Sequence, residues 1–309
     1  MSLSAASAVA ELRIICGPTG AGKSAIAMAL AERHGLTLVS ADSRQIYRGF
    51  DIGTAKPTAA DRARVPHVGI DVADPSERWS AARWADDAER AIHEVGAAHT
   101  LVVGGTGLYL KALLTPLFNA PPLDPTARAS LDSVLSTLSV DELRRWCRSL
   151  DPALAELGRT QLLRAIETAL LTGERLSELQ ARLARPPRFR AQWLVVDPGH
   201  ALASQLEQRL DSMLAGGWPD EVRQLEATVP PDAPAWNACG YSAVRKMMHG
   251  DCTPAEAREA ILVSTRQYAK RQRTWFRHQL EGQPVVRLDP ALSSAVGLAD
   301  TWWRTGDFS

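Results

Sequence analysis

The feature that most constrains the fold of this 309-residue chain is a glycine-rich octapeptide near its start, Gly17-Pro18-Thr19-Gly20-Ala21-Gly22-Lys23-Ser24. The octapeptide fits the pattern GxxxxGK[ST] at every defined position. A short apolar run, Leu12 to Cys16, precedes it, and the residues from Lys23 to Arg33 have helical composition. A strand, a glycine-rich turn and a helix in this order form a loop whose backbone amides surround an anion at the helix start.

The octapeptide predicts a site for a diphosphate or a triphosphate. Lys23 supplies a full positive charge, and the Ser24 hydroxyl can join the ligands of a magnesium ion that also holds phosphate oxygens. We therefore expect the whole octapeptide, Gly17 to Ser24, to hold phosphates, with Ser24 as a ligand of Mg²⁺. The loop recognises phosphates and not the group attached to them, so it does not by itself predict ATP.

Further apolar runs predict that the octapeptide belongs to an α/β fold of the P-loop NTPase type. These runs, each of strand length, are residues 36–40, 101–103, 193–196 and 285–288. Strands that alternate with helices indicate a parallel sheet with helices on both faces. Residues 124–184 show helical patterns and no strand candidate. We therefore predict a core domain of residues 1–117 and 191–309, and an all-helical insertion domain of residues 118–190.

Composition limits the classes of protein that remain. The formal net charge is +0, so any basic surface that binds nucleic acid must be local. The four cysteines form no CxxC pair, which argues against a zinc site and a disulfide framework. No run approaches the roughly 18 apolar residues of a membrane span, and the alanine-rich N-terminal segment lacks the basic start of a signal peptide. We expect a cytoplasmic protein, monomeric, with no membrane and no obligate protein partner.

A polar segment, Ser40 to Tyr47, follows the second predicted strand and contains Asp42. The carboxyl ends of the strands in an open parallel sheet face the ligand crevice, so Asp42 is expected near the phosphates. Its carboxylate could act as a base on a second substrate or reach magnesium through water. It could equally cap a helix, and position alone does not separate these roles. Arg44 and Gln45 beside it could hydrogen-bond the edges of a nucleobase.

A run near the C-terminus carries basic residues at helical spacing: Arg266, Lys270, Arg273 and Arg277. Intervals of four, three and four place these side chains on one helical face. Trp275 and Phe276 lie nearby, and a cationic face with aromatic side chains suits an RNA backbone. A solvated amphipathic helix is the alternative.

Five segments together resemble the bacterial tRNA dimethylallyltransferases. They are the octapeptide, Ser40-Ala-Asp-Ser-Arg-Gln-Ile-Tyr47, Asp51-Ile-Gly-Thr-Ala-Lys-Pro57, Val103-Gly-Gly-Thr-Gly-Leu-Tyr109 and the run from Ser264 to Phe276. Their order and spacing match the family as well, and the resemblance covers roughly residues 12–118 and 192–280. The second and third segments are far more specific than the octapeptide, which many enzymes share.

The resemblance implies a reaction. The enzyme would move the dimethylallyl group of dimethylallyl diphosphate to the exocyclic amine of the adenosine 3′-adjacent to the anticodon, in tRNAs that read codons beginning with U. It implies that Asp42 is the catalytic carboxylate and that Thr106, also catalytic, lies at the mouth of a reaction channel. It further implies that Arg209 helps the loop hold diphosphate, although Arg209 could also be a solvated helix arginine.

The resemblance also implies a set of contacts with the tRNA anticodon stem-loop. They involve Asp42, Ser43, Arg44, Gln45, Thr106, Arg128, Gln161 and Arg164, together with Arg266, Lys270 and Arg273 of the basic run. The chain departs from the family at several positions. A His-Pro-x-Asp element is shortened before Arg159, and Gln205, Asn237 and Ser242 stand where the family commonly has arginines.

Two other functions remain open. A small-molecule or nucleoside kinase with the same loop would bind ATP and transfer its γ-phosphate. An RNA-binding regulator that has lost catalysis would bind tRNA without turnover. The Asp42 segment and the basic run disfavour the kinase, while the departures in the insertion leave the regulator conceivable.

Overall fold

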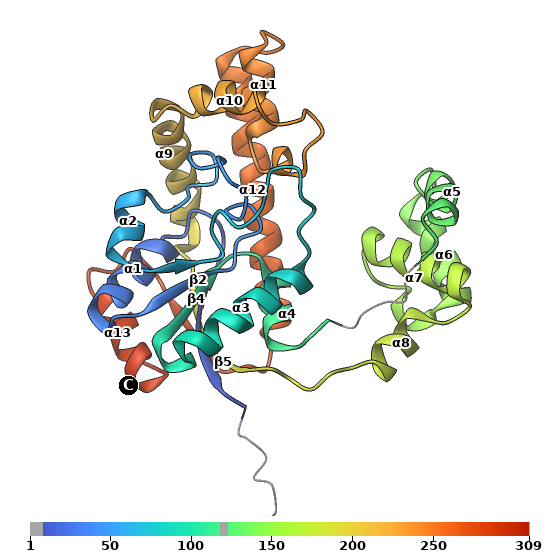
Figure 1. Ribbon diagram of the computed structural model, residues 1–309, viewed down its shortest axis with the longest axis horizontal. Helices are drawn as coiled ribbons and strands as arrows, with labels where there is room; N and C mark the ends of the chain where they lie inside the picture. The colour runs from blue at the N-terminus through green and yellow to red at the C-terminus, as the bar shows by residue number, and fades with distance from the viewer. Residues whose placement is uncertain (1–8, 118–122, 309) are drawn as a thin grey trace, which may run out of the picture. The chain divides into compact units, whose positions relative to one another are not determined.

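A computed structural model of the chain describes residues 9–117 and 123–308 (Figure 1). It forms two compact units, a core unit of Met1–Thr115 with Pro187–Ser309 and a helical unit of Pro116–Pro186. The predicted start of the insertion, residue 118, lies outside the described residues. Its predicted end, residue 190, is too late, because Arg190 already begins a strand of the core sheet.

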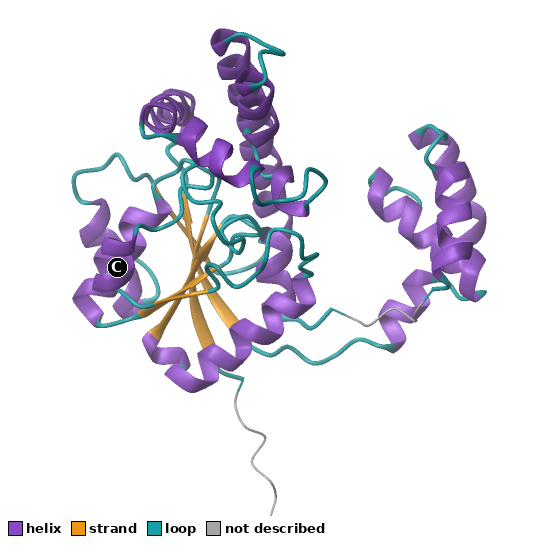
Figure 2. Ribbon diagram, turned by 45° about the horizontal axis from the view of Figure 1, so that its top comes forward, coloured by secondary structure: helices purple, strands orange, loops and turns teal. Residues whose placement is uncertain are grey.

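The core unit contains one sheet of six parallel strands in the order β3-β2-β4-β1-β5-β6 (Figure 2). The strands are β1 (Glu11–Cys16), β2 (Thr37–Ser40), β3 (His67–Val68), β4 (Thr100–Gly104), β5 (Arg190–Val196) and β6 (Val285–Leu288). The five predicted strands and the predicted fold class are confirmed. Strand β3 was missed, because a pair of residues with one histidine gives no apolar run.

Helices cover both faces of the sheet, as Figure 2 shows. The helices of the core unit, in chain order, are α1 (Lys23–His34), α2 (Ala59–Arg64), α3 (Ala81–Val95), α4 (Gly107–Leu114), α9 (Leu202–Ala215), α10 (Trp218–Glu226), α11 (Tyr241–Met248), α12 (Pro254–Gln279) and α13 (Ala295–Thr305). Helix α1 buries Ile26, Ala27 and Leu30, which recur at helical spacing, in a core shared with α13 through Trp302. This apolar stripe fixes which side of α1 faces the sheet.

The loops that follow β2 and β4 lie against each other at the carboxyl edge of the sheet. A Cβ added to Gly104 would come within 2.2 Å of the carbonyl oxygen of Ala41, so only glycine permits this approach. The Thr106 amide donates a hydrogen bond of 3.1 Å to the same carbonyl. The segment that carries Asp42 is thereby held against the segment that carries Thr106.

The helical unit is built from α5 (Pro125–Leu135), α6 (Val140–Leu150), α7 (Arg159–Thr172) and α8 (Leu176–Arg182). Leu143, Leu162 and Ile166 lie in its apolar core. The buried carboxylate of Asp151, just after α6, accepts hydrogen bonds from the amide of Ser177 at 2.9 Å and from its hydroxyl at 2.6 Å. This one side chain therefore ties α6 to the start of α8.

Replacing Asp151 by alanine should lower the free energy of unfolding of the helical unit by about 1–3 kcal/mol, since two partly buried donors of Ser177 lose their acceptor. Amide hydrogen exchange should accelerate in α6 and α8 and stay unchanged in α1 and β1. Asp141→Ala, at an exposed position of α6, is the matched control and should change stability by less than about 0.5 kcal/mol. Unchanged exchange in α8 of the Asp151 variant would contradict this role.

Candidate active site

A cavity of about 560 Å³ opens at the carboxyl edge of the sheet, within the core unit. Its polar lining comes from distant parts of the sequence: Lys23 and Ser24 of α1, Asp42, Arg44 and Gln45 after β2, Arg209 of α9, and Tyr268 and Gln272 of α12. Leu206, Leu210, Ile261 and Leu262 add an apolar wall. The size and the mixed lining are typical of a small-molecule site.

The phosphate loop turns between β1 and α1, as its sequence predicts. Thr19, Gly20, Lys23 and Ser24 line the large cavity, while Gly20 to Ser24 also line a neighbouring hollow beside α9. Gly17 and Pro18 line neither. The Thr19 amide donates to Oε1 of Gln272 at 2.8 Å, so this predicted phosphate ligand directs its N–H to α12.

The cationic side of the site consists of Lys23 and Arg209. The Lys23 ammonium is partly buried and donates a 2.7 Å hydrogen bond to the Pro18 carbonyl. Burial lowers the pKa of Lys23 to about 8, while the Asp42 carboxylate raises it and the Arg209 guanidinium lowers it. Burial likewise lowers the pKa of Arg209, and Asp42 acts in the opposite direction. The three groups therefore lie within one electrostatic neighbourhood, as a diphosphate site with an adjacent carboxylate requires.

Asp42 both stabilises a turn and lines the cavity. Its Oδ1 accepts hydrogen bonds from the amides of Arg44 at 2.8 Å and Gln45 at 3.4 Å, which stabilises a turn of residues 43–46. No helix follows, so the capping role applies to a turn. The same carboxylate lines the cavity and interacts with Lys23 and Arg209.

Thr106 lies beside this carboxylate, although it is not among the residues that line the cavity. Its Oγ1 accepts a 3.0 Å hydrogen bond from the amide of Ser43, the residue after Asp42. Burial raises the pKa of Tyr268 to about 12, and a hydrogen bond between its side chain and Thr106 acts in the opposite direction. Thr106 thus joins the Asp42 turn to α12.

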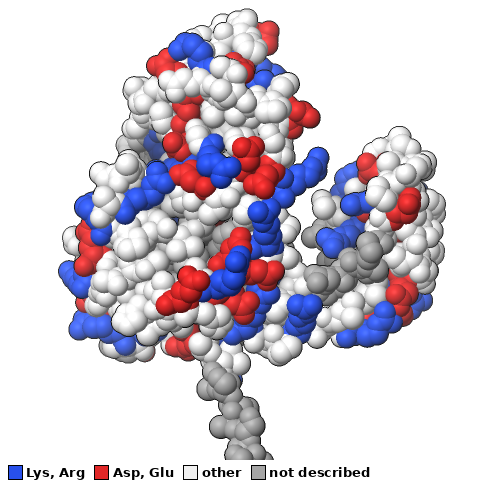
Figure 3. Space-filling view, viewed as in Figure 1, with Lys and Arg blue, Asp and Glu red and all other residues white. Residues whose placement is uncertain are grey.

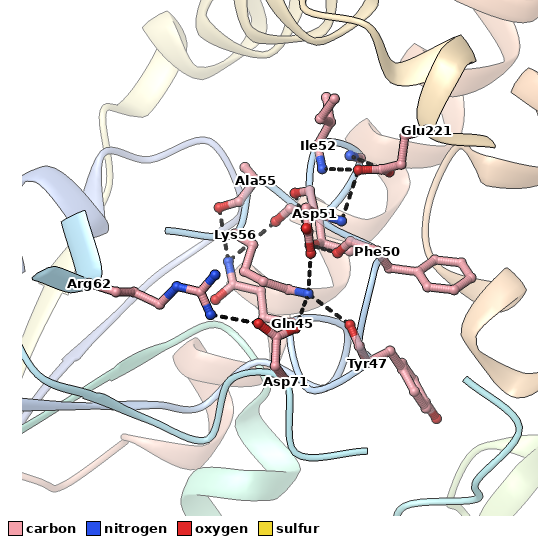
Figure 4. Close-up of polar contacts among 12 residues, drawn as sticks. Gln45, Tyr47, Phe50, Asp51, Ile52, Ala55, Lys56, Arg62, Asp71 and Glu221 are labelled. Carbon is pink, nitrogen blue, oxygen red and sulfur yellow. Dashed lines mark hydrogen bonds and ion pairs between the residues drawn. The ribbon is translucent and has the colours of Figure 1, made fainter. Parts of the chain in front are cut away.

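A buried lysine holds the loop that closes one side of the cavity (Figure 4). Nζ of Lys56 donates to the Tyr47 carbonyl at 2.7 Å, to Oδ1 of Asp51 at 2.5 Å and to Oδ1 of Asp71 at 2.6 Å. Arg62 pairs with the other oxygen of Asp71 at 2.6 Å. Because every Lys56 proton has an acceptor, its ammonium stabilises the loop and is not a candidate nucleophile.

Glu221 of α10 supports the same loop from its other side (Figure 4). Its Oε2 accepts hydrogen bonds from the amides of Asp51 at 3.0 Å and Ile52 at 2.6 Å, and its Oε1 accepts one from the Tyr241 hydroxyl at 2.6 Å. Sequence reasoning missed Glu221, Tyr268 and Gln272. An acidic or amide side chain on a helix gives no signal of the loop that it contacts in the fold.

Several residues predicted to contact tRNA form hydrogen bonds or ion pairs with other residues of the core unit. Nε2 of Gln45 donates to the carbonyls of Thr54 and Ala55, so its donors stabilise the cavity wall. Arg266 pairs with Glu207 at 2.5 Å, and Arg273 forms a two-bond ion pair with Asp197. Those two arginines therefore link α12 to neighbouring segments. The prediction of a basic helical face that binds RNA did not include these ion pairs.

Other predicted contacts remain at the surface. Lys270 and Arg277 are exposed on α12, and Arg44 lines the cavity. In the helical unit Gln161 and Arg164 are exposed near the start of α7, and Arg128 pairs with Glu167 at 3.3 Å. Figure 3 shows Lys and Arg interspersed with Asp and Glu on the visible face of the core unit, which agrees with the zero net charge.

The part of the chain that the structure describes contains no cluster of three or more histidine, cysteine, aspartate or glutamate side chains that could hold a metal. Within residues 9–117 and 123–308, no helix has both the length and the apolar content to cross a membrane.

The parallel sheet, the phosphate loop and the cavity at the carboxyl edge of the sheet define an α/β protein of the P-loop class. The model of the IPP transferase family matches residues 45–279, and that of isopentenyl transferase matches residues 10–71. The chain therefore belongs to the tRNA dimethylallyltransferase family of prenyl-transferring enzymes, which confirms the resemblance seen in its motifs.

Individual relatives support this assignment. A tRNA dimethylallyltransferase of Chromohalobacter salexigens is 41% identical over 275 residues, 85% of this chain and 88% of that protein. One of Anaeromyxobacter sp. (strain Fw109-5) is 43% identical over 277 residues, 87% of this chain and 92% of that protein.

Two solved structures are also similar. The tRNA isopentenylpyrophosphate transferase of Bacillus halodurans has a TM-score of 0.68 at 29% identity and covers 96% of both chains. A eukaryotic dimethylallyltransferase acting on tRNA has a TM-score of 0.71 at 26% identity, over 91% of this chain and 74% of that one.

The pKa of Lys23 leads to a pH dependence of anion binding. Affinity for an alkyl diphosphate should be constant below pH 8 and fall up to about tenfold per unit above it, because the lysine then loses its charge while the phosphates, with a second pKa near 6, stay ionised. Calorimetric titrations from pH 6.5 to 9.5 measure this. Lys23→Met should bind more weakly throughout and show no transition near pH 8. A wild-type affinity that is constant up to pH 9.5 would contradict the expectation.

Proposed function

We propose that this chain transfers the dimethylallyl group of dimethylallyl diphosphate to the exocyclic amine of the adenosine 3′-adjacent to the anticodon, in tRNAs that read codons beginning with U. The products are N6-isopentenyladenosine and diphosphate. The observation that carries this proposal is the common cavity of Asp42, Lys23 and Arg209 beside the phosphate loop. The names of the relatives, which describe dimethylallyl transfer to tRNA, support it.

The cationic side of the cavity suits the departure of diphosphate. When the allylic C–O bond breaks, its electron pair leaves with the diphosphate oxygen, and the allylic carbon gains positive charge. Lys23 and Arg209 are placed to neutralise the departing anion, and the loop amides from Gly20 to Ser24 add oriented dipoles. The loop then stabilises a leaving group instead of positioning a γ-phosphate for attack.

The carboxylate suits activation of the acceptor. The exocyclic amine of adenine is a weak nucleophile, because its lone pair is delocalised into the ring. As the new N–C bond forms, the amine must lose a proton, and Asp42, which lines the cavity and interacts with Lys23 and Arg209, would receive it. Because Oδ1 already accepts two amide hydrogen bonds, Oδ2 is the oxygen that would take the proton.

The same residues fit a magnesium ion. Magnesium prefers oxygen ligands, and it usually keeps several waters while it binds substrate phosphates and one or two carboxylates. Ser24 lines both the cavity and the neighbouring hollow, and Asp42 lines the same cavity. Ser24 would hold the ion, which would supply further neutralisation of the diphosphate charge.

The acceptor base must leave its stack to enter the cavity, which costs less in a single-stranded loop than in a duplex. Arg44 in the cavity lining and the exposed Lys270 are placed to contact the RNA. Arg128, Gln161 and Arg164 would contact the anticodon stem from the helical unit. We further propose that the enzyme works as a monomer in the cytoplasm.

Incubation of the protein with unmodified tRNA, dimethylallyl diphosphate and Mg²⁺ tests the proposal. Mass spectrometry of the digested tRNA should show isopentenyladenosine, and only for tRNAs whose anticodons read U-initial codons. Transfer of the γ-phosphate of ATP without prenylation would instead indicate a kinase. Tight tRNA binding without either product would indicate a regulator.

In this assay Asp42→Ala should lower the single-turnover rate at least ~100-fold while tRNA still binds, from the usual size of a lost general base. Asp42→Asn is the sharper variant, because its amide oxygen can still accept the hydrogen bonds from Arg44 and Gln45 while its proton affinity is lost. Both variants should be slow. An active Asn variant beside a slow Ala variant would reduce Asp42 to a residue that stabilises its turn.

Salt titrations of tRNA binding test whether the exposed Lys270 of α12 contacts an RNA phosphate. Lys270→Gln should weaken binding and reduce the slope of log affinity against log salt by about 1, as expected for one lost phosphate contact. Arg90→Gln, which removes an exposed charge from α3, is the control and should leave the slope unchanged. Equal slopes for wild type and Lys270→Gln would exclude this contact.

A further inference from the structure

Gln272 is a buried amide in α12 that bridges two loops of the site. Its Oε1 accepts the hydrogen bond from the Thr19 amide of the phosphate loop at 2.8 Å. Its Nε2 donates to the carbonyl oxygen of Gly105, after β4, at 2.9 Å. Both ends of one short side chain are therefore committed, each to the backbone of a different loop.

The contact between Gln272 and the loop after β4 leaves no room for a side chain at position 105. A Cβ added to Gly105 would come within 2.2 Å of Nε2 of Gln272, so the loop backbone lies directly against the amide. Tyr268, one helical turn earlier, forms its hydrogen bond with Thr106. Helix α12 thus contacts the 104–106 loop at two successive turns.

These contacts continue to the carboxylate. Gly105 precedes Thr106, and Oγ1 of Thr106 accepts the hydrogen bond from the amide of Ser43, next to Asp42. The path from Thr19 through Gln272, Gly105 and Thr106 to Ser43 consequently joins the phosphate loop to the Asp42 turn. Gln272 accepts the hydrogen bond that connects this path to the phosphate loop.

We propose that Gln272 is a positioning residue that sets the separation and orientation of the phosphate loop relative to Asp42. This inference rests on the proposed function, because prenyl transfer needs the diphosphate and the acceptor amine in one fixed geometry across the cavity. A misplacement of the reacting groups by 1 Å can reduce a rate about 100-fold.

The chemistry of the bridge requires an acceptor and a donor in the same side chain. A glutamate at this position would face the Thr19 N–H correctly, but its ionised form would bring a second acceptor against the Gly105 carbonyl and a negative charge beside the phosphates. A protonated glutamate has a carbonyl and an O–H in nearly the geometry of the amide. Burial and the adjacent carbonyl both disfavour the ionised form, so protonation should be reached at moderate pH.

Single-turnover prenyl transfer measured from pH 5.5 to 8.5 for wild type, Gln272→Met and Gln272→Glu tests this role. Gln272→Met should be about 100-fold slower than wild type at every pH. The ratio of the Gln272→Glu rate to the wild-type rate should be low at pH 8.5 and rise up to tenfold per unit as pH falls. Gln224→Glu, which makes the same substitution at an exposed position of α10, should keep a ratio near one throughout.

Each outcome decides a separate point. A Gln272→Glu ratio that is flat with pH, or a Gln272→Met rate within threefold of wild type, would overturn the positioning role. Melting curves at each pH show whether a slow variant is merely unfolded; if Gln272→Met does not fold, recovery of the Gln272→Glu rate at low pH carries the test, and lack of recovery refutes it. Wild-type protein that transfers no prenyl group would refute the proposed function instead.

Discussion

The proposed site depends on one carboxylate, that of Asp42, which lies close to two cations, Lys23 and Arg209. Asp42 raises and Arg209 lowers the pKa of Lys23, while Asp42 is anchored through Oδ1 to its own turn and Lys23 to the Pro18 carbonyl. Asp42 and Lys23 are therefore held by hydrogen bonds with the backbone. Such pre-orientation leaves the cations free to meet a diphosphate and the carboxylate free to meet an acceptor, with little reorganisation during the reaction.

The fold provides this arrangement through backbone contacts at the carboxyl edge of the sheet. The approach of Gly104 to Ala41 joins the loops after β2 and β4, and the buried Lys56 and Glu221 fix the 51–57 loop as a wall. These groups touch no reacting atom in the proposed chemistry. Their effect is to exclude alternative loop conformations, so that the charged residues keep their places.

The sequence predicts the sheet and the phosphate loop better than it predicts the side-chain contacts that fix the loops of the site. The octapeptide and the apolar runs specify the sheet, the phosphate loop and α1, because strand and helix periodicity are local properties. Asp42 is recognisable from its place after β2, but its turn-stabilising bonds are not. Glu221 and Gln272 could not be identified, since the loops that they contact lie 167 to 253 residues away in sequence and the side chains carry no spacing signal. The ion pairs of Arg266 and Arg273 were missed for the same reason: helical spacing reveals a shared face, not what covers it.

Helix α12 carries both cavity-lining side chains and exposed cations. Thr265, Tyr268 and Gln272 recur at intervals of three and four residues and face the cavity, whereas Lys270 lies off that line and is exposed. Arg266 and Arg273 lie at the border and pair with Glu207 and Asp197, which fixes the rotation of the helix about its axis. A change in that rotation would move Gln272 and Tyr268 together. Lys270, which we propose contacts RNA, and the cavity-lining Tyr268 and Gln272 thus lie on opposite sides of one helix.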